Sequence, residues 1–99
     1  MQGFYAATFE RDMSCTEAEW LSWLPGAVRE HALTLALGQA SVSIGSGILQ
    51  LRWAPLPPRQ IALMRLPRLG VSFHFDSVEE AERQSFMRYF DLYMQRGGG

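Results

Sequence analysis

The 99-residue sequence predicts an α+β fold, a two-layer sandwich in which two helices cover one face of a mainly antiparallel sheet of five to six strands. Apolar residues alternate through most of residues 32–75, which is the period of strands with one buried face. Segments with helical spacing and capping-box residues flank this region. The order is strand, helix, five strands, helix, without a repeat or a linker. We therefore expect one α+β domain at residues 1–96 and a flexible glycine tail at 97–99.

The composition is that of a folded chain with little net charge. It is 47% hydrophobic and 19% charged, with a net charge of -1, so we expect one core and no strong overall field. All nine basic residues are arginine, and Lys and Asn are absent, which is typical of a GC-rich bacterial genome. The single cysteine excludes an intramolecular disulfide. The start lacks a secretory pattern, and no apolar run reaches the ~18 residues of a membrane span, so we expect a cytoplasmic protein.

The N-terminal part predicts a strand followed by an interrupted helix. Residues 3–9 have the composition of a strand. Ser14 and Thr16 each precede a glutamate by three positions, and these overlapping capping boxes predict a helix start. The apolar stripe that follows crosses Pro25. A proline inside a helix costs about 3 kcal/mol, so we expect a kink or a break there.

Residues 32–53 predict three strands of an antiparallel meander. Gly38-Gln39 and residues 45–47 supply the turns. The alternation predicts the following inward-facing residues: Leu33, Leu35, Leu37, Ala40, Val42, Ile44, Leu49, Leu51 and Trp53. The opposite phase is small and polar apart from Ile48, and it consists of Thr34, Ala36, Ser41, Ser43, Gln50 and Arg52, continued later by Ser72 and His74. Such a face is either plain solvent surface or a surface for a second copy or a partner protein.

The rest of the chain predicts a stiff connector, two more strands and a helix. Residues 55–58 contain three prolines and favour an extended connector. Residues 59–66 predict a strand of ambiguous phase, and a turn follows at Pro67. Residues 69–75 alternate again, with an inward set of Leu69, Val71, Phe73 and Phe75. Ser77 precedes a glutamate by three positions and predicts the last helix, whose inner stripe includes Phe86, Phe90 and Tyr93.

Charge separates the predicted sheet from the predicted helices. Residues 31–75 contain four arginines and no acid, whereas the segments before and after carry net charges of -3 and -2. The plainer interpretation is that acidic helices neutralise a basic sheet and that arginines protect strand ends. The functional interpretation is a surface for an anion or an acidic partner. The residues of this candidate surface are Arg52, Arg59, Arg65, Arg68 and His74.

Other chemistry has weaker support. Residues 68–75 are similar at first sight to the third strand of RNA-recognition motifs, but Gly70 and Ser72 stand where that motif needs stacking aromatics, which disfavours nucleic acid. Cys15 lies near a predicted helix start, but neighbouring glutamates oppose a thiolate, so a structural role is favoured. Trp23, on the flank of its helix, is a candidate partner anchor, with a wide core-facing stripe as the alternative.

The sequence therefore predicts no catalytic, cofactor or metal site, and leans against an enzyme. We expect a protein-interaction module, either a homodimer or the receptor of an acidic protein. The alternatives are a binder of a small anionic or phosphorylated ligand and, third, a nucleic-acid binder. No contact with a membrane is expected.

Overall fold

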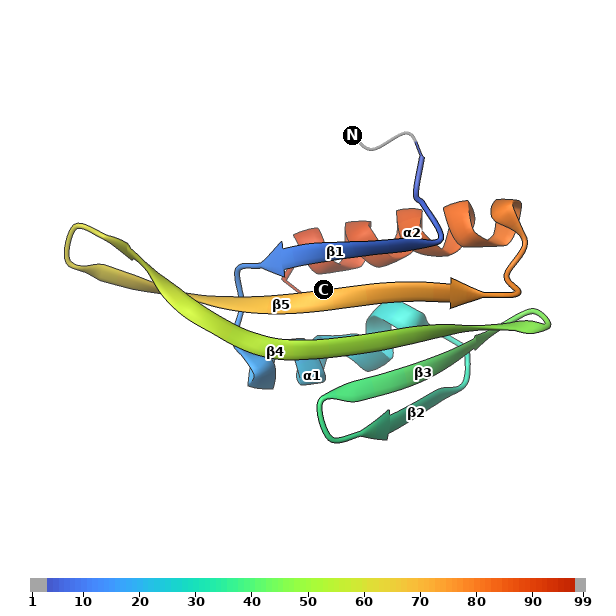
Figure 1. The fold of residues 1–99 in the computed structure, drawn as a ribbon, viewed down its shortest axis with the longest axis horizontal. Coiled ribbons are helices and arrows are strands. Elements are labelled where there is room, and N and C mark those ends of the chain that lie inside the picture. The colour runs from blue at the N-terminus through green and yellow to red at the C-terminus, as the bar shows by residue number, and fades with distance from the viewer. Residues whose placement is uncertain (1–3, 98–99) are drawn as a thin grey trace.

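The chain forms a five-stranded antiparallel sheet with both helices packed on one of its faces (Figure 1). A computed structural model describes residues 4–97. Its elements are β1 (Thr8–Met13), α1 (Glu17–Val28), β2 (Leu33–Ala36), β3 (Gln39–Ile44), β4 (Gly47–Ile61), β5 (Met64–Asp76) and α2 (Glu80–Gln95). The strands lie in the order β1-β5-β4-β3-β2, so the first strand pairs with the last. The predicted two-layer α+β fold is confirmed.

The core lies between the helices and the inner face of the sheet. Trp20 of α1 contacts Trp53 and Phe90 edge to face, with ring centroids 5.6 and 6.0 Å apart, and Phe90 packs on Phe73. The predicted inward residues from Ala40 onward are buried. They are Ala40, Val42, Ile44, Leu49, Leu51, Trp53, Leu69, Val71, Phe73 and Phe75. None of the helices in the described chain is long and apolar enough to cross a membrane.

Helix α1 starts as predicted but does not break. Thr16 is the N-cap: its hydroxyl accepts from the Glu19 N–H at 3.1 Å, and the Glu19 carboxylate accepts from the Thr16 N–H at 2.9 Å. Of the kink or break predicted at Pro25, the break is wrong, because α1 continues to Val28. Pro25 lies on the exposed side of the helix, where water can bond the carbonyl that lacks its usual N–H donor.

The β2–β3 hairpin differs from the prediction in two ways. Ala36 pairs with Gln39, so the turn residues are Leu37 and Gly38 rather than Gly38 and Gln39. Gly38 has a φ of +69°, which glycine tolerates at the second turn position. The prediction that Leu35 and Leu37 face inward and are buried is wrong for their burial: both are exposed, because β2 is an edge strand and Leu37 lies in its turn.

The first strand begins later than predicted. It covers Thr8–Met13 rather than residues 3–9, of which Gly3 lies outside the described residues. Phe9, Arg11 and Met13 face the helices. The charges of Glu10, Arg11 and Asp12 suggested that the strand ended before them, but these residues belong to β1.

The proline-rich segment is part of a strand, not a connector. β4 continues through Pro55, Pro57 and Pro58, although its register with β5 shifts between Leu56 and Arg59. β3 pairs with β4 only as far as Arg52, so the prolines remove no hydrogen bond to that neighbour. The predicted separate strand at residues 59–66 is wrong: these residues form the tip of the β4–β5 hairpin, so four strands rather than five lie between the helices.

The last helix has a different start. The predicted capping box at Ser77 is wrong, because α2 begins at Glu80 and its N-cap Glu79 makes no side-chain capping bond. Ser77 has a φ of +61°, and its hydroxyl donates to Asp76. At the other end the Gly97 N–H donates to the Met94 carbonyl at 3.0 Å. The remaining two glycines of the predicted tail lie outside the described residues.

Candidate functional site

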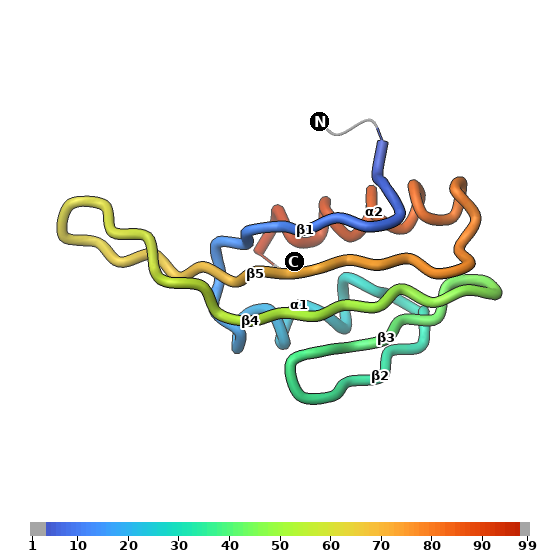
Figure 2. Tube along the Cα trace, viewed as in Figure 1, coloured from blue at the N-terminus to red at the C-terminus, as the bar shows by residue number. Residues whose placement is uncertain are grey.

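The β4–β5 hairpin extends beyond the other strands as an arm, which we define as residues 55–68 (Figure 2). β1 and β3 pair with the hairpin only up to Leu69 and Arg52, respectively. No arm residue is buried. At its tip Ile61, Leu63 and Met64 are exposed, and the Leu63 side chain is 99% exposed. The arm therefore adds nothing to the core and presents apolar side chains to solvent.

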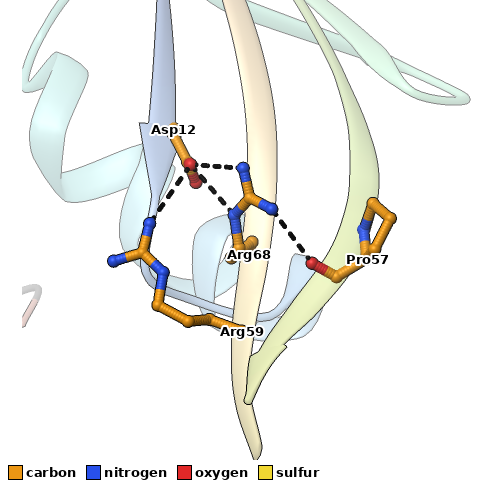
Figure 3. Close-up of polar contacts among 4 residues, drawn as sticks. All are labelled: Asp12, Pro57, Arg59 and Arg68. Atoms are coloured by element: carbon orange, nitrogen blue, oxygen red, sulfur yellow. Dashed lines mark hydrogen bonds and ion pairs between the residues drawn. The ribbon is translucent and has the colours of Figure 1, made fainter. Parts of the chain in front are cut away.

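Asp12 of β1 braces the base of the arm (Figure 3). Its Oδ2 accepts from Arg68 Nε at 2.9 Å and from Arg68 Nη2 at 2.6 Å, and Arg59 Nη2 lies 3.8 Å away. Arg68 Nη1 also donates to the Pro57 carbonyl at 3.2 Å. Arg68 thus connects both strands of the arm to the edge of the sheet.

The charges at this base stabilise one another. The hydrogen bond from Arg68 lowers the pKa of Asp12, and the positive charges of Arg68 and Arg59 add to this effect. The same hydrogen bond raises the pKa of Arg68. Asp12 was not expected at this site, since it lies 56 positions from Arg68 in the sequence, outside the basic segment. No local sequence pattern links the two.

The structure divides the predicted arginine surface. Arg59 and Arg68 meet at Asp12. Arg65 lies farther out, opposite Gln60, and Arg52 lies on the uncovered sheet face. Within residues 4–97, the side chains of Arg52 and Arg65 have no hydrogen bond or ion pair. The five candidates do not form one compact cluster.

The sheet face opposite the helices consists mainly of polar residues, as the alternation predicts. Strand register aligns one polar row across all five strands, made of Thr8, His74, Gln50, Ser41 and Thr34. A second row consists of Glu10, Ser72, Arg52, Gln39 and Ala36. His74 Nδ1 is 2.9 Å from Thr8 Oγ1. His74 therefore already has a partner on its own face.

A cleft of about 770 Å³ between β1 and α2 contains a second charge network. Arg11 donates two hydrogen bonds to Asp91, and the Tyr5 hydroxyl donates to Asp91 Oδ2 at 2.6 Å. The Arg11 guanidinium lies over the Phe9 ring, 5.3 Å from its centroid. Burial raises the pKa of Tyr5, and the hydrogen bond to Asp91 adds to this. The polar groups of these three residues, Tyr5, Arg11 and Asp91, satisfy one another, so they form a structural network rather than a reactive site.

The sequence does not indicate this network. The first strand was expected to end at residue 9, which would place Arg11 in a loop. Asp91 lies in α2 and reads there as an ordinary exposed acid. Only the observed register, with Arg11 opposite Val71 on the inner face, brings the pair together.

The remaining candidates have structural surroundings. Cys15 is buried, and burial raises the pKa of its thiol, with the charge of Glu19 acting in the same direction. Trp23 is half-buried and packs against the core. In the described part of the chain, no three His, Cys, Asp or Glu side chains gather as a metal site would require. No family model, curated protein or solved structure matches this chain.

Proposed function

We propose that this protein is a non-enzymatic interaction module and that the arm binds an acidic protein partner. The observation that carries the proposal is the exposed apolar tip at Ile61, Leu63 and Met64. Large apolar side chains held away from a protein's own core are typical of contact anchors. The Arg68–Asp12 brace supports a defined direction for the arm, which lowers the ordering cost of binding.

The charge of the arm indicates the partner's chemistry. Residues 55–68 contain Arg59, Arg65 and Arg68 and no acid. Arg65 has its guanidinium available to a carboxylate, and Arg59 has only a long contact to Asp12. A complementary partner has an apolar pocket for Leu63 with acidic residues around it. We place this activity in the cytoplasm of a bacterium as part of the proposal.

The two alternatives have less support. A small anion would use Arg52, Arg59, Arg65 or His74, but the depression at the base of the arm is also lined by Glu10 and Asp12, which repel anions. A nucleic acid needs many phosphate contacts. Among the arginines of the sheet and the arm, only Arg52 and Arg65 have no side-chain partner within the described residues, and two arginines provide few such contacts.

Site-specific crosslinking tests the proposal. A photo-crosslinking amino acid replaces Leu63 in one variant and Leu92 in a control, since Leu92 is an exposed leucine that belongs to α2 and not to the arm. In the native host we expect a discrete covalent adduct from position 63 and none from position 92. The adduct should weaken with added salt, because arginines contribute to the contact. Equal labelling from both positions would contradict the proposal.

A further inference from the structure

The two edges of the sheet differ in how well they are protected from pairing with a strand of another chain. β1 carries Glu10, Arg11 and Asp12 along its length, and charges on an edge strand discourage pairing with another strand. β2, at the other edge, has the sequence LTLA. Residues 31–51 contain no Asp, Glu, Lys or Arg at all. The β2 edge therefore lacks the charges that protect β1.

Apolar side chains gather on the same side of the molecule. Leu35 faces the helix layer but is 50% exposed, and Leu37 in the following turn is 98% exposed. Leu21 of α1 is also exposed. It lies about 140° around the helix from Gly26, which contacts Tyr93 of α2, so Leu21 is on the flank turned away from α2 and toward β2. These leucines would normally be buried, but no part of the described residues covers them fully.

The backbone of β2 is also ready to pair. The Ser43 N–H donates to the Ala32 carbonyl at 3.0 Å. Hydrogen-bonded pairs alternate along an antiparallel ladder, so Leu33 and Leu35 direct their N–H and C=O groups away from β3. No strand of the described chain lies on that side. The edge thus offers both backbone groups and leucines to an added strand.

We propose that the occupant is β2 of a second copy, which joins two five-stranded sheets into one continuous sheet. A two-fold axis brings the same surface of both copies together and places residues close to the axis beside their own counterparts. Like charges there would repel, whereas an uncharged surface is compatible with itself. The charged arm would repel a second arm. A charged peptide from another protein would find no complementary charge on residues 31–51. In the dimer, Leu21 and Leu35 of both copies lie on the helix side of the junction, and Leu37 lies in the adjoining turn.

This surface is separate from the arm. The proposal therefore goes beyond the binding of an acidic partner and does not depend on it. Antiparallel pairing of β2 strands reverses the direction of one copy, so the two arms extend from opposite ends of the dimer. Each arm then remains accessible to its own partner.

Three exposed apolar residues on three different surfaces allow a matched test. Leu35 lies on the β2 edge, Ile48 on the uncovered sheet face and Leu63 at the arm tip. Each is changed separately to Glu, and the mass is measured by sedimentation equilibrium. We expect the wild type, Ile48→Glu and Leu63→Glu to have twice the chain mass of 11.2 kDa. Leu35→Glu should have half the wild-type mass while retaining its far-UV circular dichroism.

Any other set of masses from folded variants overturns the dimer. A wild type that stays monomeric at millimolar concentration excludes it. Loss of the dimer in Ile48→Glu with retention in Leu35→Glu assigns the interface to the uncovered face instead. If Leu35→Glu fails to fold, Leu37→Glu replaces it, because Leu37 is almost wholly exposed. Crosslinking from position 63 is scored independently of mass, so failure of the dimer and failure of arm binding are distinguishable.

Discussion

Gly47 has no room for a side chain. A Cβ at this position would overlap the backbone carbonyls of Asp76 and Ser77, which cannot rotate away as a side chain can. We expect Gly47→Ala to lower the free energy of unfolding by about 2 kcal/mol or more. Gly38→Ala is the control: its φ of +69° is strained for alanine, but the nearest atom is 3.5 Å away, so about 1 kcal/mol is expected. Urea denaturation measures both, and equal losses would contradict the overlap.

Tyr5 makes the free energy of unfolding depend on pH in the alkaline range. Its pKa is raised in the folded protein by burial and by the hydrogen bond to Asp91. The unfolded side chain ionises near pH 10, so the stabilisation is complete below that pH and is lost as the pH rises through the higher folded value. We expect the wild type to lose stability above about pH 10 more steeply than Tyr5→Phe. Urea midpoints across this range test it, and parallel profiles would contradict the raised pKa.

Cys15 should be inert in the folded state. Burial and the nearby charge of Glu19 raise the pKa of its thiol, so little thiolate exists at neutral pH. We expect a thiol reagent to modify Cys15 at the rate of global unfolding, and therefore faster in Gly47→Ala than in the wild type. Rapid modification of the native wild type would show that the thiol is accessible and would argue against its structural role.

At the scale of elements, the contacts at the base of the arm give different roles to two arginines, Arg65 and Arg68, that look alike in the sequence. Arg68 contacts both Asp12 and Pro57, whereas Arg65 contacts neither. We expect Arg68→Ala to speed amide hydrogen exchange in residues 55–68, and Arg65→Ala to leave it unchanged. The lowered pKa of Asp12 means that the brace persists above pH 4 and is lost as the pH falls through the lower folded value. Equal exchange in both variants would exclude a bracing role for Arg68.

The alternation of apolar residues predicted the sheet because helices cover one of its faces, and the residues on that face are apolar. It succeeded for Leu49, Leu51 and Trp53, which are buried in the core between the sheet and the helices. It failed for Leu35, because the same alternation occurs on an edge strand, where the helices of the described residues leave this side chain half exposed. Periodicity reports which side of a strand is apolar, but not what lies against it.

Local signals failed where tertiary contacts decide the structure. Three prolines suggested a connector, but β4 has only β5 beside it at that point, so no hydrogen bond to β3 is lost. The candidate arginines were found from charge alone. Their division into a brace and an accessible pair depends on Asp12, which the first strand brings to the base of the arm. Contacts between such distant parts of a sequence have no local signature.

At the scale of the whole molecule, the arm and the globule are separable. The longest dimension is 47 Å, against 30 and 24 Å for the others, and the arm lies along the long axis (Figure 1). Every buried apolar residue lies outside residues 55–68. The fold therefore does not require the arm, and its exposed leucine and arginines have a role other than folding. Contact with a partner is the role that we propose.

Deleting the arm tests this separation. Leu56 pairs with Arg68, so replacing residues 57–67 with Asn-Gly closes the hairpin through a two-residue turn. Because no core residue is lost and the loop is shorter, we expect the free energy of unfolding to change by less than about 1 kcal/mol. The β2 edge is unaltered, so the deletion variant should keep the mass of the wild type. It should no longer compete with the wild-type arm for the partner crosslinked at position 63. A variant that unfolds would show that the arm belongs to the fold, and one that competes fully would place the partner's contact elsewhere on the molecule.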